Sequence, residues 1–324
     1  MSSAEAAPVE PPPSRAGRNL PVAIAVGVGL GALIIVSLAF YKYLFAVLVT
    51  AAILIAVWEL YNAFLHNDIK LARSPLFLVA FVGPTLAYLY GVEAHMVVFG
   101  TFVVVALAWR IRRGTDGFVK DATGSLFVAF YLPFMVGFVM LMLRETDGVA
   151  RIVAFIAITV CNDVGGYFAG VMFGKHPIAP QISPKKSWEG FAGSLILSIA
   201  VAIPLFAIAF GAPWWQAVIF GAIMPITATA GDFIESAIKR DLDVKDMSNI
   251  IPGHGGLMDR LDSLIPNAFV SWALLGLFLG WPRSRWSCRP HAVASRRGTC
   301  STWTSRRASR PWLNWAVRRS GRTS

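Results

Sequence analysis

Long apolar runs recur along this chain, and they constrain its fold more than any other feature of the sequence. Each run is long enough to cross the roughly 30 Å of hydrocarbon in a lipid bilayer. A soluble helix of similar length would carry charged or polar residues along one face. Hydrophobic residues make up 56% of the chain, and their concentration in long runs indicates a polytopic membrane protein rather than one large soluble domain.

We expect about nine membrane-spanning helices. The first is predicted to be a retained helix and not a signal peptide, because its apolar run is too long for a signal peptide and leads straight into further spans. The third and fourth predicted spans are the shortest. The ranges are 20–39, 43–64, 76–91, 95–111, 125–143, 149–173, 190–210, 214–238 and 264–281.

Lysine and arginine are concentrated in alternate connections between these spans, and positive charge marks the cytoplasmic side of a membrane protein. The N-terminus and the loops 174–189 and 239–263 therefore face the cytoplasm in our prediction. These two loops are also the richest in polar residues, so they are expected to cooperate. The predicted fold class is an all-α polytopic integral membrane protein with a polar cavity that faces the cytoplasm.

The two ends of the chain differ from this apolar body. Residues 1–18 are rich in Pro, Ala and Ser, which predicts a disordered arm. Residues 282–324 hold eleven arginines and no Lys, Asp or Glu; without these eleven, the 29 basic residues fall to 18, equal to the 18 acidic ones. The net charge of +11 therefore indicates no nucleic-acid-binding module. We interpret 19–281 as a transmembrane catalytic domain, and the tail either as a basic solvated or lipid-binding segment or, as we favour, as an out-of-frame ending.

One polar stretch, residues 231–262, lies between two of the apolar runs and contains six aspartates, one glutamate and a Gly-rich turn. Asp232 and Glu235 are three residues apart, so both project from one face of a helix. Asp259 and Asp262 repeat this spacing just before the ninth span, provided that the last helix begins early. Two acidic pairs from two helices would form an oxygen-rich site that suits Mg²⁺, with substrate phosphates completing its coordination.

Ionisable residues inside membrane spans are unfavourable to insert, so their presence suggests a function. Asp163 lies midway along the sixth predicted span, and the glycines at positions 165–174 predict close contact with a neighbouring helix. Close helix contact explains the glycines but not the aspartate, and we place Asp163 in the active cavity. Glu59 lies near the cytoplasmic end of the second span, where a snorkelling or capping role and a catalytic role are equally open.

The two cytoplasmic loops supply candidate phosphate-binding groups. Loop 181–190 places lysines and hydroxyls at the start of a helix, where free N–H groups favour anions, although an ordinary positive-inside loop would also explain the lysines. In the second loop, the glycines at 252–256 allow the backbone to approach a ligand, and His254 is either a base or a structural strut. The candidate phosphate- or substrate-binding residues are Ser183, Lys185, Lys186, Ser187, Lys239, Arg240, Lys245, His254 and Asp163.

Carboxylates for a divalent metal, cations for phosphates and walls of membrane helices favour phosphoryl or nucleotidyl transfer to a lipid. The sequence contains neither a GxxxxGK[ST] motif nor a GxSxG motif, so P-loop nucleotide chemistry and a serine esterase are not supported. The rival from another class is an ion transporter. A transporter predicts carboxylates in both halves of the membrane and internal repeats, neither of which we find.

The polar stretch also resembles the signature of a known family, the phosphatidate cytidylyltransferases or CDP-diacylglycerol synthases. Residues 163–170 and 182–190 are similar to the blocks that precede this signature, with Ser187 where threonine is more common. The resemblance covers about residues 150–280. The signature positions are Ser236, Lys239, Arg240, Lys245, Asp246, Pro252, His254, Gly255, Gly256, Asp259, Arg260 and Asp262.

The resemblance implies that CTP and phosphatidic acid give CDP-diacylglycerol and pyrophosphate, with Mg²⁺ as cofactor and K⁺ as a second candidate ion. Asp232, Asp259 and Asp262 would be the metal-site carboxylates and, with Lys239 and Arg260, the catalytic residues. The lipid phosphate can attack the α-phosphorus of CTP without an obligatory side-chain base. A structural or phosphate-contacting role for His254 is therefore favoured.

We accordingly expect a multi-pass protein of the bacterial cytoplasmic (inner) membrane whose active site faces the cytoplasm. Its expected partners are CTP, phosphatidic acid and membrane lipid, with no nucleic acid, and a homodimer is left open. Two rival enzymes would share the metal chemistry but change the lipid. They are a polyprenol kinase and an archaeal-type lipid cytidylyltransferase.

Overall fold

The structure is a computed structural model that describes residues 20–244, 247–248, 250 and 256–280, without the side chains of residues 20–28, 30, 184 and 185. The predicted N-terminal arm and the Arg-rich tail lie outside the described residues. Its elements are α1 (Leu20–Phe40), α2 (Lys42–His66), α3 (Arg73–Tyr90), α4 (Val92–Ile111), α5 (Phe118–Ala129), η1 (Phe130–Phe134), α6 (Met135–Arg144), α7 (Gly148–Phe173), β1 (Pro177–Ala179), β2 (Ser183–Ser187), α8 (Trp188–Phe210), α9 (Trp214–Asp241), α10 (Met258–Leu261) and α11 (Leu264–Leu279).

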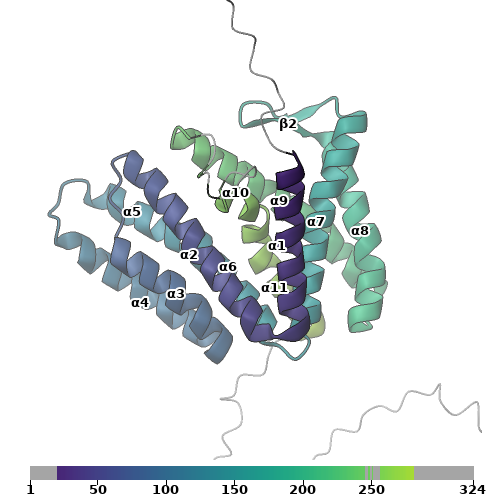
Figure 1. Cartoon of the computed structure of the whole chain (residues 1–324), viewed down its shortest axis with the longest axis horizontal. Helices are drawn as coiled ribbons and strands as arrows, with labels where there is room; N and C mark the ends of the chain where they lie inside the picture. Colours follow the sequence, from purple (N-terminus) through teal and green to yellow (C-terminus); the bar gives the residue numbers. More distant parts are fainter. Residues whose placement is uncertain (1–19, 245–246, 249, 251–255, 281–324) are drawn as a thin grey trace, which may run out of the picture. The chain divides into compact units, whose positions relative to one another are not determined.

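Each of the nine predicted spans coincides with one helix or with a run of consecutive helices (Figure 1). Among the residues that the structure describes, seven helical segments are long and apolar enough to cross a membrane. Helix α3 and helix α1, whose side chains are described only in part, are not among the seven. The all-α polytopic class is confirmed, whereas the count of nine spans and the direction in which the cavity faces stay predictions.

The connection between α7 and α8 is a small exception to the all-α fold. Strands β1 and β2 form an antiparallel hairpin in which Pro177 pairs with Ser187 and Ala179 with Ser183. The sequence analysis predicted only a loop here. Prolines at 177, 180 and 184 explain the extended backbone, because proline and the residue before it disfavour the α conformation.

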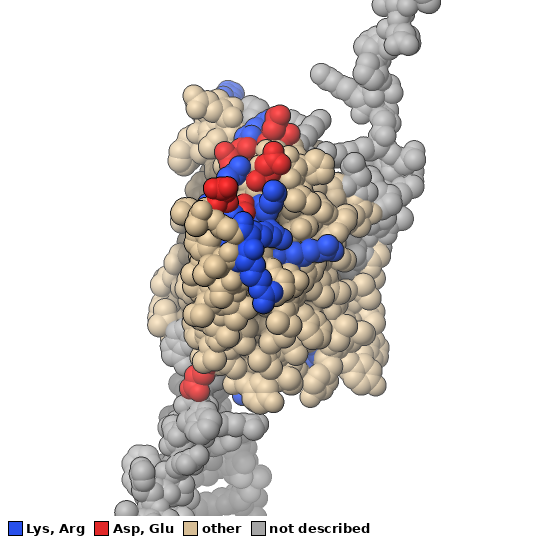
Figure 2. Space-filling model, turned by 90° about the vertical axis from the view of Figure 1, so that its left-hand side faces the viewer, with Lys and Arg blue, Asp and Glu red and all other residues tan. Residues whose placement is uncertain are grey.

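Hydrogen bonds between distant connections define the two ends of the helical body. At one end, the side chain of Asn67, just after α2, donates to the carbonyl of Leu242 after α9 (3.0 Å), and Lys120 of α5 donates to the carbonyl of Asn67 (3.3 Å). At the other end, Lys42 donates to the carbonyl of Glu145 (2.7 Å). We call the first of these the polar end. Figure 2 shows charged side chains gathered toward one end of one face, above a broad surface with few charges.

Helices α7 and α8 share the most extensive contact of the described helix pairs. A Cβ atom added to Gly165 would lie 2.7 Å from the carbonyl oxygen of Gly193, and one added to Gly190 would lie 2.9 Å from that of Gly166. Only glycine fits at such distances. The close helix contact predicted from the glycines of α7 is therefore confirmed.

An aromatic cluster fills the core where α4, η1 and α6 meet. The buried ring of His95 stacks on Phe134 (5.1 Å between ring centroids) and also contacts Phe99 and Phe138. The five-residue π-helix η1 contains Pro133, whose missing N–H disrupts the α-helical hydrogen-bond pattern. This wider turn joins α5 and α6 into one long apolar segment, 118–144.

Candidate active site

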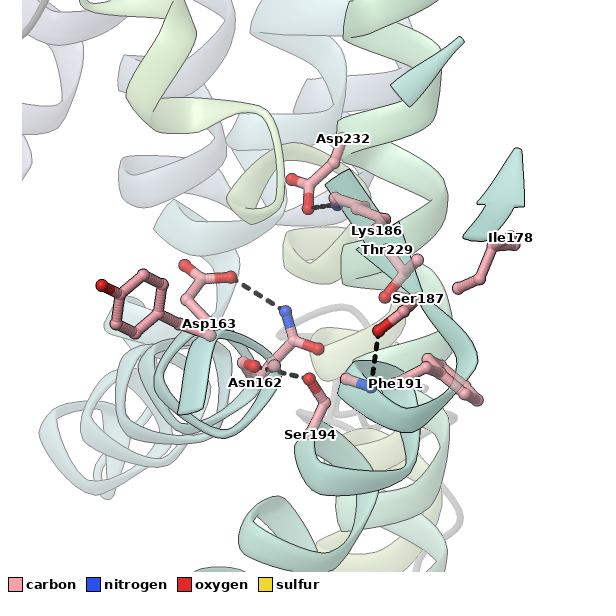
Figure 3. A pocket seen from close by; sticks show the side chains of 12 residues that line it. Asn162, Asp163, Ile178, Lys186, Ser187, Phe191, Ser194, Thr229 and Asp232 are labelled. Carbon is pink, nitrogen blue, oxygen red and sulfur yellow. Dashed lines mark hydrogen bonds and ion pairs between the residues drawn. The ribbon is translucent and has the colours of Figure 1, made fainter. Parts of the chain in front are cut away.

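A pocket of about 220 Å³ opens beside the hairpin, between α7, α8 and α9 (Figure 3). Pockets that enclose a whole small ligand usually measure roughly 300–1,000 Å³. This one can therefore hold part of a larger ligand, such as a phosphate group. It is lined by Asn162, Asp163, Gly166, Tyr167, Ile178, Lys186, Ser187, Gly190, Phe191, Ser194, Thr229 and Asp232.

Lys186 of β2 and Asp232 of α9 form an ion pair in the lining of this pocket (Figure 3). Both side chains are largely shielded from solvent, with exposed fractions of 30% and 18%. Burial lowers the pKa of the Lys186 ammonium to about 8, against the attraction of three nearby carboxylates. The lysine consequently keeps its positive charge at neutral pH, inside a pocket where charges interact strongly.

The wall formed by α7 contributes oxygen atoms. The side-chain amide of Asn162 donates to Asp163 (2.9 Å), and its backbone carbonyl accepts a hydrogen bond from Ser194 (2.6 Å). The side-chain oxygen of Asn162 is buried and has no hydrogen-bond partner within the described residues. Together with the carboxylate of Asp232 and the hydroxyl of Thr229, these groups make oxygen the ligand atom that the pocket lining offers to a metal ion. Oxygen ligands suit a hard cation such as Mg²⁺.

A second charged cluster lies nearer the end of α9. The ammonium of Lys239 contacts Asp259 (3.0 Å) and Glu235 (3.4 Å). The other oxygen of Asp259 accepts backbone hydrogen bonds from Met247 (3.2 Å) and Gly256 (2.8 Å). Asp259 therefore holds the loop after α9 in place, and its two oxygens are largely occupied by groups of the protein.

Asp262 interacts electrostatically with both charged clusters. Its charge acts on groups from three other elements: Asp163, Lys186 and Glu235. The backbone of Asp262 also touches α9, because a Cβ added to Gly231 would lie 2.3 Å from its carbonyl oxygen. The polar stretch 231–262 thus folds back on itself and meets α7 and the hairpin.

The structure brings most of the predicted site residues together. Asp163, Lys186, Ser187 and Asp232 line the pocket, and Lys239 pairs with Asp259 beside it. Ser187 is in addition the N-cap of α8, where its hydroxyl accepts the N–H of Gly190 (3.1 Å). Ser183, Arg240 and Arg260 are described but do not line the pocket. Lys245, His254 and the side chain of Lys185 lie outside the described residues.

The predicted metal ligands Asp232, Asp259 and Asp262 are each engaged elsewhere. Asp232 pairs with Lys186, Asp259 with Lys239 and two amides, and Asp262 accepts the N–H of Ser263 (2.8 Å). In the part of the chain that the structure describes, no three His, Cys, Asp or Glu side chains are grouped to hold a metal ion. The donors are nevertheless all oxygens, which fits Mg²⁺ chemically, and the ligand set stays a prediction.

Sequence reasoning missed several residues of this region. Asn162 is adjacent to Asp163, and Thr229 precedes Asp232 by three residues on α9, so the i, i+3 rule could have found it. Tyr131 of η1 has a buried hydroxyl without a hydrogen-bond partner in the described part, close to Glu235. Nothing in the local sequence points to Tyr131, because Glu235 lies far away in the chain, on α9.

Comparison with known proteins covers most of the chain. Residues 21–278 match the model of the Cytidylyltransferase family. The chain is 37% identical over 279 residues to the phosphatidate cytidylyltransferase of Mycobacterium leprae (strain TN). This alignment covers 81% of this chain and 89% of the relative. It is 36% identical over 277 residues to that of Mycobacterium bovis (82% and 90%), and 33% identical over 180 residues to that of Bacillus subtilis (strain 168; 55% and 67%).

Proposed function

The chain belongs to the cytidylyltransferase family, and on this premise we propose how its pocket takes part in the reaction. The protein is a membrane-embedded nucleotidyltransferase of phospholipid biosynthesis. It transfers the cytidylyl group of CTP to phosphatidate, giving CDP-diacylglycerol and pyrophosphate. The relatives are named for phosphatidate, so the polyprenol kinase and the archaeal-type rival receive no support from them.

We infer that the pocket beside the hairpin binds phosphate groups of the substrates. The observation that carries this proposal is the Lys186 ammonium, which is charged, largely buried and placed directly before the N-terminus of α8. Both the ammonium and the helix end favour an anion. In the structure Lys186 has only the carboxylate of Asp232 as its ion-pair partner among the described residues, and a bound phosphate would compete with that carboxylate.

The proposed chemical step is attack by an oxygen of the lipid phosphate on the α-phosphorus of CTP. A new P–O bond forms to the lipid phosphate, the bond between the α-phosphorus and the β-phosphate oxygen breaks, and pyrophosphate leaves with that electron pair. The chain's part is to position both anions and to neutralise their charge. Lys186, Lys239 and Arg260 are the proposed cations, and no side-chain base is required.

Mg²⁺ is the proposed cofactor, with K⁺ as a second candidate ion. Asp232, Asp259 and Asp262 would hold the metal, and the bound ion would supply positive charge to the phosphate oxygens. Their support is the oxygen-only chemistry of the donors. In the structure Asp232 is paired with Lys186 and Asp259 with Lys239. When metal and substrate bind, the carboxylates would exchange these lysines for the metal, and the lysines would turn to the substrate phosphates.

We further propose that the polar end faces the cytoplasm and that the protein resides in the bacterial inner membrane. Two observations support this. The curated relatives are bacterial, and the cationic connections lie at the polar end, as the positive-inside rule expects for the cytoplasmic side. A homodimer is left open, as in the sequence analysis.

The assignment is tested with purified protein in lipid vesicles, supplied with CTP labelled on its α-phosphate. Phosphatidate and Mg²⁺ should give a labelled CDP-lipid and release unlabelled pyrophosphate. CTP labelled on the γ-phosphate should leave the lipid unlabelled, whereas a polyprenol kinase would label its lipid from that position. Failure to form labelled CDP-lipid in vesicles that contain folded protein would overturn the assignment.

A further inference from the structure

Glu59 is a charged residue in the membrane-spanning helix α2, and its side chain is entirely buried, with an exposed fraction of 0%. Its carboxylate accepts hydrogen bonds from the backbone N–H groups of Leu257 (2.9 Å) and Met258 (2.7 Å) and from the hydroxyl of Ser248. Ser248 and Leu257 lie between α9 and α10, and Met258 is the first residue of α10. A snorkelling side chain would reach toward water, so the burial of Glu59 excludes that role.

The same segment is held from its other side by Asp259, which accepts the N–H groups of Met247 and Gly256. Gly256 lies between the two carboxylates. A Cβ added there would lie 3.0 Å from an oxygen of Asp259 and 3.0 Å from an oxygen of Glu59. Two carboxylates from helices far apart in the sequence therefore hold one stretch of backbone between them, and glycine is the residue that leaves room for both.

The position of Glu59 also matters for the start of the last helical segment. Leu257 and Met258 are the residues at which α10 begins, and Asp259 and Arg260 follow at once. Because the N–H groups at a helix start have no partners within the helix, a carboxylate that accepts them fixes both the location and the direction of that start. Displacing this carboxylate would shift the backbone that carries Asp259 and its contact with Lys239.

We propose that Glu59 is a positioning residue for the cytidylyl-transfer reaction: it holds the start of α10 so that Asp259, Arg260 and Asp262 face the site. Glu59 does not line the pocket, and its contacts are with protein groups that are not themselves reacting. Its effect on turnover is therefore exerted through the segment that it holds. The kinetic part of the test rests on the proposed site, whereas the contact itself is tested independently of activity.

Three variants form a graded series. Glu59→Gln keeps the size but replaces one acceptor oxygen by an NH₂ group that faces a backbone N–H. Ser248→Ala removes the hydroxyl that donates to Glu59 and that also accepts the N–H of Ile250 (3.3 Å), and leaves both backbone contacts of Glu59 in place. Glu93→Gln is the matched control. It makes the same Glu-to-Gln change in a membrane-spanning helix, but Glu93 lies exposed in the first turn of α4 and has no comparable contact among the described residues.

We expect Glu59→Gln to lower kcat per folded molecule by roughly tenfold or more, because a buried donor loses a charged acceptor and small displacements at a reacting centre have large effects on rate. The KM for phosphatidate should stay within about threefold of the wild-type value. Ser248→Ala should lower kcat by roughly two- to fivefold, and Glu93→Gln should leave it unchanged.

The contact is measured by hydrogen–deuterium exchange in peptides that contain Leu257 and Met258. Exchange there should be faster in Glu59→Gln, while peptides from α7 and α8 should match the wild type. An unchanged kcat per folded molecule would assign Glu59 a purely structural role and overturn the proposal. A lower kcat with unchanged exchange at Leu257 and Met258 would also overturn it, because Glu59 would then act on substrate directly. Should Glu59→Gln yield no folded protein, the same two outcomes are read from Ser248→Ala.

Discussion

Replacement of Gly231 by alanine tests whether the contact between α9 and the last helical segment sets the geometry of the site. A Cβ at this position would lie 2.3 Å from the carbonyl oxygen of Asp262, 2.7 Å from Cγ of Pro266 and 3.0 Å from its Cδ. Backbone and a proline ring cannot rotate away, unlike a flexible side chain. The two helices must therefore separate, and Asp262 must move with its backbone.

The size of the effect follows from these distances. Carbon and oxygen atoms in close contact are usually about 3.3–3.6 Å apart, so the helices must separate by about 1 Å. Overpacking of this kind typically destabilises a protein by about 1–3 kcal/mol. Alanine is favoured over glycine inside a helix by about 1 kcal/mol, which offsets part of that loss. A displacement of about 1 Å at a reacting centre can lower kcat roughly 100-fold, so activity should respond more than stability.

The assay compares Gly231→Ala with Gly100→Ala, a helical glycine of α4 that has no atom within 4 Å of an added Cβ. Thermal unfolding in detergent and kcat in lipid vesicles are measured for both variants. Gly100→Ala should be slightly more stable than the wild type and fully active, because only helix propensity changes. Gly231→Ala should unfold at a lower temperature than Gly100→Ala and lose most of its activity. Wild-type kcat in Gly231→Ala would refute the reasoning.

Four further outcomes are expected. Asp232→Ala and Asp259→Ala should abolish CDP-lipid formation while the protein still inserts into membranes; normal activity in either would remove that residue from the site. Lys186→Met should raise the KM for CTP at least tenfold, because one buried charge–phosphate contact is lost, and an unchanged KM would place the triphosphate elsewhere. Chelation of divalent ions should stop turnover, and added Mg²⁺ should restore it. Deletion of residues 284–324 should have little effect on kcat, because the family match ends at residue 278; a large loss would show that the tail takes part.

The helical body could be predicted from the sequence because span length and apolar content are local properties. Every predicted span corresponds to helical structure. Helical periodicity also predicted that Asp232 and Glu235 project from one face of a helix. In the structure each of them contacts a lysine: Asp232 contacts Lys186, and Glu235 contacts Lys239. The close contact of α7 with α8 could be predicted because only glycine permits it.

Contacts that depend on the tertiary fold could not be predicted. Asp259 carries the residue type of a metal ligand, but its backbone and lysine partners come from the way in which the following loop folds. Glu59 is separated from Leu257 by 198 residues, and no local pattern relates them. Tyr131 of η1 lies near Glu235 of α9, and no local pattern relates these two residues either. Residue types indicated the chemistry, whereas the partner of each group was decided by three-dimensional arrangement.

The burial of Glu59 has a consequence for when, during synthesis of the chain, its hydrogen bonds can form. Its carboxylate enters the membrane with α2, whereas the amides that it binds are synthesised 198 residues later. At a synthesis rate of roughly 5–20 residues per second, this interval lasts about 10–40 s. The carboxylate lies toward the polar end of α2 and can stay hydrated at the membrane surface during that time. Only the arrival of residues 257–262 completes its hydrogen bonds and adds Asp259 and Asp262 to the proposed site, so we expect a chain interrupted before that point to be inactive.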